Sequence, residues 1–167
     1  NIDLRSDTIT IPTKEMLDYM LHAKVGDDVW EEDATVKDLE NHLASLFSKE
    51  AALFCPSGTM TNQIAIRVHT KMGDELICDR LSHIYNYEGG GIASNSGVSV
   101  KLIDGDCGRM SLAQIKNNIN SDDVHLSRTS LVCLENTVNK GGGVCYDYHE
   151  IQAISKYCKT NNLMFHL

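Results

Sequence analysis

Short apolar runs alternate with segments of helical periodicity along the chain, and this alternation constrains the fold more than any other feature. Strand-like runs are expected at 51–54, 75–78, 98–103, 130–135 and 163–167. Helices are expected at 13–23, 59–70, 84–94, 111–119 and 147–160, and another is expected to start at Thr35, with Thr35 as its cap and Asp38 three residues later. Because helices between consecutive strands imply right-handed crossovers, the pattern predicts an α/β fold, with a mainly parallel sheet and helices on both faces.

The segment 130–135, SLVCLE, is apolar almost throughout, which is typical of a central strand that is covered on both faces. The 167 residues are enough to bury a substantial core. We find no internal repeat, no linker and no low-complexity segment in the sequence. We therefore expect one α/β unit.

Charge and composition argue against several classes of function. A net charge of -8 disfavours nucleic acid or an anionic membrane as the main partner. The apolar runs are far shorter than a bilayer span, and no basic-then-apolar leader opens the sequence, so a cytoplasmic protein is expected. The six scattered cysteines contain no C-x-x-C pair, and the seven histidines form no helical metal motif, so reduced thiols and no metal site are expected.

The stretch CPSGTMTNQ, residues 55–63, lies where an apolar run passes into a helical pattern. Free backbone N–H groups and the helix dipole at such a start can bind a phosphate, with the hydroxyls of Ser57 and Thr59 as further donors. Gly58 would let the backbone approach closely. The alternative is that Ser57 or Thr59 only caps the helix, and the absence of a nucleotide-binding glycine motif disfavours a nucleoside triphosphate or a dinucleotide.

Five blocks of sequence together resemble a known family. In chain order they are LRSDT, VGDDVWEEDATV, KEAALFCPSGTMTNQ, SHIYNYEGGG and DVHLSRTSLVCLENTVNKGGG. They are similar to the N-terminal half of the low-specificity L-threonine aldolases, which are pyridoxal 5'-phosphate enzymes of the aspartate aminotransferase fold type in the β-eliminating lyase group. The resemblance implies that 1–167 is the N-terminal part of the cofactor-binding large domain, with an N-terminal arm at 1–24.

The resemblance also implies a reaction. The family cleaves L-threonine or L-allo-threonine to glycine and acetaldehyde, with the pyridine ring of the cofactor as electron sink. A base removes the proton of the β-hydroxyl group. The family further implies a homo-oligomer, a dimer of dimers, with active sites shared between subunits.

Residue by residue, the resemblance assigns the phosphate to Gly58 and Thr59, in agreement with the reading of 55–63. His83 matches the residue that stacks on the pyridine ring. Ser6 matches a residue near the substrate carboxylate, and His125 matches a histidine near the substrate hydroxyl, which serves as the base or positions a water.

Three further residues are assigned to the pocket by resemblance. Glu88 matches an acidic residue of the active-site wall, which assists the base through water. Tyr85 and Trp30 would line the pocket, although many relatives have tyrosine at the position of Trp30.

Plainer interpretations stand beside these assignments. A loop histidine such as His125 is more often a surface residue, and Glu88 before three glycines could be a solvated helix residue. The acidic residues between Asp27 and Asp33 are typical of solvated surface and only weakly indicate a divalent-metal site. Relatives commonly have histidine and arginine where Val138 and Lys140 stand, and Lys140 lacks the bidentate fork of arginine.

In the family, the lysine that binds the cofactor covalently and the aspartate that pairs with the pyridine nitrogen follow the segment that matches 163–167. We therefore expect these 167 residues to be part of a longer aldolase and to be inactive alone. Two alternatives stay open: another β-eliminating lyase, such as a tryptophanase-like enzyme acting on an aromatic amino acid, and a short non-catalytic subunit that modulates full-length partners.

Overall fold

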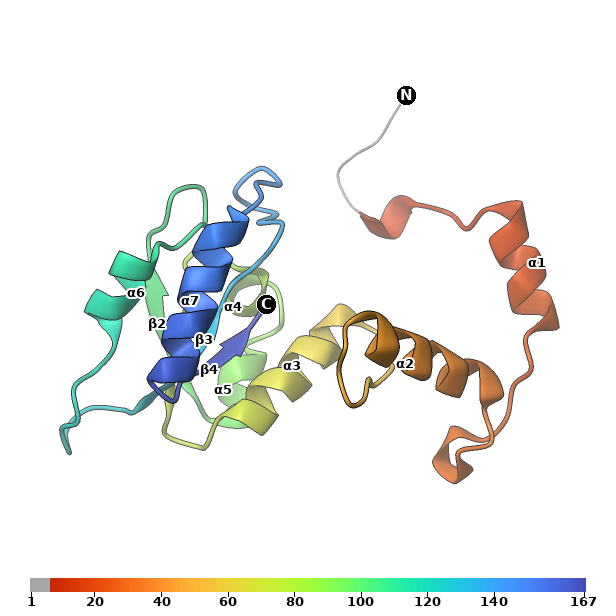
Figure 1. Ribbon diagram of the computed structural model, residues 1–167, viewed down its shortest axis with the longest axis horizontal. Helices are drawn as coiled ribbons and strands as arrows, with labels where there is room; N and C mark the ends of the chain where they lie inside the picture. Colours follow the sequence, from red (N-terminus) through yellow and green to blue (C-terminus); the bar gives the residue numbers. More distant parts are fainter. Residues whose placement is uncertain (1–6) are drawn as a thin grey trace. The chain divides into compact units, whose positions relative to one another are not determined.

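The computed structural model describes residues 7–167, and these residues form two compact units, with the boundary between Phe54 and Cys55 (Figure 1). Ser6, a predicted substrate-binding residue, lies outside the described residues.

The first unit consists of short helices joined by extended segments: the 3-10 helices η1 (Asp7–Ile9) and η2 (Asp28–Trp30), and the α-helices α1 (Lys14–His22) and α2 (Ala34–Leu46). The predicted cap of α2 at Thr35 is wrong. Asp33 is the N-cap, because its carboxylate accepts a hydrogen bond from the Val36 N–H at 2.9 Å. The Thr35 hydroxyl instead donates to the carbonyl oxygen of Lys24 at 2.6 Å.

The expected strand at 51–54 is also wrong, since this segment has no regular secondary structure. A strand persists only where a neighbouring strand satisfies its backbone groups, and no described strand pairs with this segment. Leu53 and Phe54 remain exposed. The apolar composition of 51–54 was therefore not sufficient to make a strand.

The second unit contains a four-stranded parallel sheet in the order β2-β1-β3-β4, which confirms the predicted fold class. Its strands are β1 (Glu75–Asp79), β2 (Ser99–Ile103), β3 (Thr129–Cys133) and β4 (Met164–His166). Its helices are α3 (Gly58–His69), α4 (His83–Asn86), α5 (Gly91–Ser96), α6 (Leu112–Asn118) and α7 (Tyr148–Thr160).

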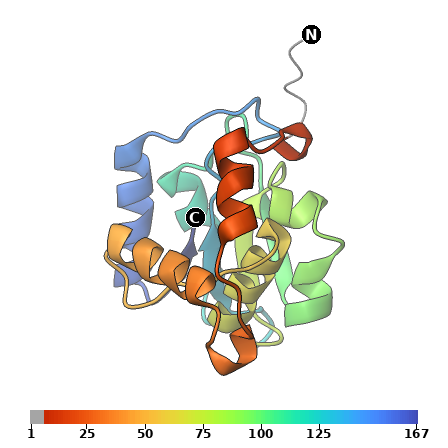
Figure 2. The same ribbon diagram turned by 90° about the vertical axis from the view of Figure 1, so that its right-hand side faces the viewer.

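Helices cover both faces of this sheet, as predicted (Figure 2). On one face, α6 and α7 pack on Ile77 and Val132 in a core cluster that also contains Ile115 and Ile154. On the other face, Leu76, Cys78, Leu131 and Cys133 pack against Ile66 of α3, Ile84 of α4 and Ile92 of α5. Every residue of β1 and β3 is buried, as expected for central strands between two helical layers.

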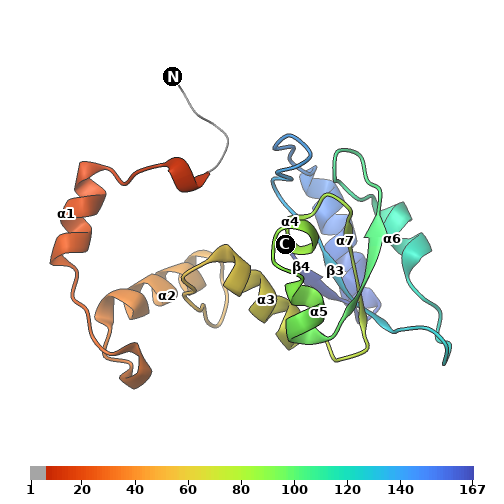
Figure 3. The same cartoon turned by 180° about the vertical axis from the view of Figure 1, so that it is seen from behind.

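The single helix predicted at 84–94 is two short helices, α4 and α5, which Figure 3 shows on the same side of the sheet. Gly89 and Gly90 separate them with φ values of 62° and 72°, a left-handed conformation that favours glycine. The break redirects the chain so that Glu88, between the two helices, is buried. None of the described helices is long and apolar enough to cross a membrane.

Candidate functional site

Three parallel strands end beside one small cavity of about 180 Å³ in the second unit. Ligands of open α/β sheets bind beyond the carboxyl ends of the strands, and this cavity lies there. His83 follows β1, Glu135 follows β3, and His166 ends β4. The cavity is lined by Asn62, Ser82, His83, Ile84, Cys133, Leu134, Glu135, Asn136, His166 and Leu167.

Two of the predicted site residues, Glu88 and His83, are in contact through the buried carboxylate of Glu88. The side chain of Glu88 is 0% exposed, and its Oε1 lies 3.1 Å from Nδ1 of His83. Two side-chain amides of α3 also donate to it: Asn62 to Oε1 at 2.8 Å and Gln63 to Oε2 at 2.6 Å. Glu88 is therefore not a solvated helix residue, because a buried carboxylate needs such partners to compensate for lost hydration.

A second carboxylate organises the backbone at the edge of the cavity. Glu135 accepts hydrogen bonds from the backbone N–H of His83 at 2.6 Å and of Asn139 at 2.9 Å. It thus ties the start of α4 to the loop that holds Lys140. The Lys140 ammonium lies 5.2 Å from the centre of the Tyr87 ring, and this ring lies 5.5 Å from that of His83.

The N-terminus of α3 carries the three predicted phosphate-binding residues. Ser57 is the N-cap, and its Oγ accepts from the Met60 N–H at 3.2 Å. No described residue accepts a hydrogen bond from the N–H groups of Gly58 or Thr59. The helix therefore presents unpaired donors at the positive end of its dipole, in the same helix whose next turn binds Glu88 through Asn62.

Burial determines the charge state of several groups near the cavity. Burial, and then the nearby His69, lower the pKa of His166, although Glu88 opposes them. Burial also raises the pKa of the Cys78 thiol to about 11 and that of Cys133 well above its usual value. These thiols stay neutral and are not nucleophiles at neutral pH.

His125 and His83 lie at opposite ends of the parallel strands. It is in the loop that precedes β3, whereas His83 follows the carboxyl end of β1, a parallel neighbour. A five-residue strand is roughly 16 Å long, and this length separates the two ends. The His125 side chain is 87% exposed, and its backbone N–H, together with its ring, lowers the pKa of Asp123 by hydrogen bonding. Its predicted catalytic role stays a prediction.

The remaining predicted residues occupy separate places. Tyr85 is on α4, two residues after His83, with a partly exposed ring. Trp30 ends η2 in the first unit and is exposed. Of the predicted site residues, His83 and Glu88 are therefore in direct contact, and the roles of Tyr85 and Trp30 stay predictions.

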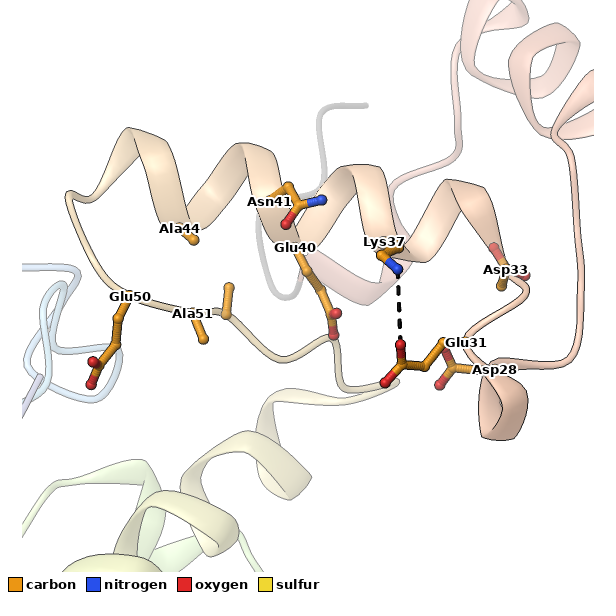
Figure 4. Close-up of a pocket in the computed structure, with 10 residues that line it drawn as sticks. Asp28, Glu31, Asp33, Lys37, Glu40, Asn41, Ala44, Glu50 and Ala51 are labelled. Atoms are coloured by element: carbon orange, nitrogen blue, oxygen red, sulfur yellow. Dashed lines mark ion pairs between the residues drawn. The ribbon is translucent and has the colours of Figure 1, made fainter.

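A second cavity, of about 260 Å³, lies within the first unit and is strongly acidic (Figure 4). The carboxylates of Asp28, Glu31, Asp33, Glu40 and Glu50 line it, and Lys37 is its basic residue, 3.9 Å from Glu31. Such a charge would repel a phosphate or an amino-acid carboxylate. Within the described residues, no group of three His, Cys, Asp or Glu side chains could hold a metal ion.

Four residues of the site were not predicted: Asn62, Gln63, Glu135 and His166. Glu135 and His166 had a usable signal, since each is a polar residue at the carboxyl end of a strand-like run. Asn62 and Gln63 had none, because polar residues in the second turn of a helix are common. Val138, at a position where the resemblance led us to expect histidine, is fully buried in the α6–α7 core cluster.

Comparison with known proteins identifies the family to which this site belongs. The sequence model of the beta-eliminating lyases matches residues 3–167. The chain belongs to the beta-eliminating lyase family. Members of the family and its threonine aldolases depend on pyridoxal 5'-phosphate.

Among relatives of this beta-eliminating lyase chain, the low-specificity L-threonine aldolase of Escherichia coli is 38% identical over 99% of the chain and 49% of its own length. The aldolase of Saccharomyces cerevisiae is 39% identical over 98% and 43%. A candidate L-allo-threonine aldolase of Listeria monocytogenes aligns with a TM-score of 0.73 and 25% identity, over 90% of this chain and 42% of its own. The chain thus spans less than half the length of these relatives.

Proposed function

We propose that the protein containing this chain is a pyridoxal-phosphate-dependent aldolase that cleaves L-threonine or L-allo-threonine to glycine and acetaldehyde. One observation carries the proposal. In a chain of the beta-eliminating lyase family, the Glu88–His83 pair contacts the second turn of α3 beyond the carboxyl ends of the strands, and the first turn of the same helix offers unpaired N–H donors.

The residues at the start of α3 fit the phosphate of the cofactor. The unpaired N–H groups of Gly58 and Thr59 and the hydroxyls of Ser57 and Thr59 would hold it at the positive end of the helix. When bound, pyridoxal 5'-phosphate supplies an electron sink for the bond that breaks.

His83 and Glu88 would orient the bound ring. The His83 imidazole lines the cavity, and its side chain is 43% exposed, so part of the ring would be accessible for stacking. Glu88 fixes the ring from behind through Nδ1. Tyr85, Trp30 and Ser6 are proposed to complete the wall and the carboxylate site of the substrate.

His125 is proposed as the base, or as the residue that positions a water for that role. Because it lies at the opposite end of the parallel strands from His83, it would contribute to the active site of a neighbouring copy in an oligomer. The proposal therefore includes a homo-oligomer, a dimer of dimers, and a cytoplasmic enzyme of amino-acid metabolism, in threonine breakdown and glycine formation.

The direct test is acetaldehyde release from L-threonine and L-allo-threonine by the purified full-length protein with added pyridoxal 5'-phosphate. Release from either amino acid is the expected result. Cleavage of tryptophan or tyrosine without acetaldehyde release would favour a tryptophanase-like lyase instead. Absence of turnover with all of these substrates would overturn the proposal and leave a non-catalytic subunit.

The phosphate site has its own test. Thr59→Asp puts a negative charge at the positive end of α3, so affinity for pyridoxal 5'-phosphate should fall about tenfold or more. Thr61→Ala is the matched control, because the Thr61 hydroxyl donates only to the Ser57 carbonyl in the same turn. Titration of cofactor absorbance measures both. Equal affinities would place the phosphate elsewhere.

A further inference from the structure

A continuous chain of hydrogen bonds links two histidines of the cavity through Asn62 and Glu88. His166 Nε2 lies 3.0 Å from Asn62 Oδ1, and Asn62 Nδ2 lies 2.8 Å from Glu88 Oε1. The same Oε1 lies 3.1 Å from Nδ1 of His83. Four side chains from four different segments therefore share one network.

With Glu88 ionised and both imidazoles neutral, this network allows one arrangement of donors. Glu88 is an acceptor when ionised, so the Asn62 NH₂ must face it, and the Asn62 carbonyl oxygen must face His166. His166 then donates from Nε2–H. His83 likewise must donate to Glu88, which places the proton of its neutral ring on Nδ1 and leaves Nε2 as the acceptor. No described residue hydrogen-bonds to Nε2 of His83.

Gln63 holds the other oxygen of the carboxylate, and a glycine makes room for it. Gln63 donates to Glu88 Oε2 at 2.6 Å, and its own Oε1 lies 3.4 Å from the Asn95 amide. A Cβ at Gly91 would lie 2.5 Å from Cδ and Oε1 of Gln63. Gly91 is therefore needed for the Gln63 amide to reach Glu88.

We propose that Asn62 and Gln63 are positioning residues that hold the Glu88 carboxylate and thereby keep neutral His83 protonated on Nδ1. They fix both oxygens of Glu88, so the carboxylate cannot turn away from the ring. The catalytic consequence of this tautomer rests on the proposed function. In an aldolase, the stacked His83 ring would present a defined hydrogen-bond acceptor, Nε2, to bound substrate. The tautomer itself can be observed without turnover.

The experiment uses the full-length, cofactor-free protein labelled with ¹⁵N-histidine. Long-range ¹H–¹⁵N spectra distinguish a protonated ring nitrogen from an unprotonated one, and His83→Gln and His166→Gln spectra assign the signals. The expected wild-type result is Nδ1–H for His83 and Nε2–H for His166. A proton on Nε2 of His83 in the wild type would overturn the proposal outright.

Three variants loosen the carboxylate from different sides: Gln63→Leu, Asn62→Asp and Gly91→Ala. In each, the Nδ1–H share of His83 should fall about twofold or more, because Glu88 loses a donor that fixes it. Asn62→Asp should leave the proton of His166 on Nε2, since an acceptor still faces it. Gln152→Leu, at an exposed position of α7, is the matched control and should leave both histidines unchanged.

Circular dichroism and urea unfolding establish that each variant is folded. An unchanged His83 tautomer in the folded variants would show that Asn62 and Gln63 are merely structural and overturn the proposal. Asn62→Asp acts on one oxygen of Glu88, and Gln63→Leu and Gly91→Ala act on the other, so loss of folding in one variant leaves the others, and the wild-type spectrum, to decide. Absence of aldolase activity in the wild-type protein, together with the expected tautomers, would count against the proposed function of the site and leave the tautomer proposal standing.

Discussion

The two units of the chain carry similar helical patterns but differ in what those helices bury. In the second unit, α3 and α7 each place residues in the core, such as Ile66 and Ile154. In the first unit, α1 and α2 have comparable apolar residues, yet no described residue from 8 to 54 is buried. The difference is thus in packing and not in helix formation.

The comparison teaches that an amphipathic pattern predicts a helix without predicting what the helix packs against. Capping and periodicity act within a few residues, so they form α1 and α2 as reliably as α7. A core requires side chains brought together from distant segments, and only 55–167 has a sheet to collect them. Most of the stability measured on this protein should therefore come from its second unit.

The largest expected effect is a core substitution. Leu131→Ala should lower the free energy of unfolding by about 3 kcal/mol, because it empties a fully buried site in β3. Leu21→Ala in exposed α1 is the control and should change it by about 0.5 kcal/mol or less. Urea unfolding of the purified protein measures both. Similar losses would show that the first unit has a core of its own.

The loss of an ion pair should change the free energy of unfolding in both units, with a smaller difference between them than for the core substitution. Arg128→Leu should cost about 1–2 kcal/mol, because the guanidinium binds the buried Asp74 carboxylate at 2.8 Å. Lys37→Leu breaks the exposed pair with Glu31 at 3.9 Å and should cost at most about 0.5 kcal/mol. Although burial opposes it, the hydrogen bond from Arg128 lowers the pKa of Asp74, so the Arg128 effect should vanish in acid as Asp74 protonates. An effect that persists there would contradict this assignment.

Helix caps allow a still closer comparison. Ser57 and Thr13 cap α3 and α1 through similar bonds, at 3.2 Å and 3.3 Å. Ser57→Ala should destabilise the protein by about 1 kcal/mol, since α3 unfolds with the core. Thr13→Ala should lower the local protection of α1 in hydrogen exchange while leaving the global unfolding midpoint nearly unchanged. An equal shift of the midpoint would mean that α1 unfolds together with the sheet.

The smallest expected effect is a pH dependence from His166. Burial lowers its pKa below the ordinary value of 6.5, so between the folded and unfolded pKa values the unfolded chain binds more protons. Stability should therefore fall as the pH drops below about 6.5, and His166→Gln should flatten this slope. His42→Gln, in exposed α2, should leave it unchanged. Urea midpoints over about pH 5–7.5 test the sign, and a steeper slope in His166→Gln would refute it.

Local chemistry explains which parts of the fold the sequence could predict. The Ser57 cap and the strands at 75–79 and 129–133 follow from residue type and periodicity. The cap at Thr35 failed because α2 already begins after Asp33, whose carboxylate accepts from the Val36 N–H, so Thr35 lies within the first turn of the helix. The segment 51–54 failed because pairing depends on a partner strand, which its own composition does not encode.

The site shows the same division between local and distant information. His83 and the start of α3 were predicted because a short motif surrounds each of them. Asn62 and Gln63 were not, since their role depends on a carboxylate 25 or 26 positions later in the chain. His125 matched a motif equally well, yet only the parallel topology shows that it lies at the opposite end of the strands from His83.

The strand order β2-β1-β3-β4 has a consequence for how the sheet can assemble on the ribosome. Of the strands in the described residues, β1 is synthesised first and is central, β2 adds to one side of it, and β3 adds to the other. β4 then adds to β3, so among these four strands each emerging strand joins an edge strand that already exists and none is inserted between two others. Domains can fold vectorially during synthesis, and this topology lets the sheet widen outward without unpairing any earlier strand.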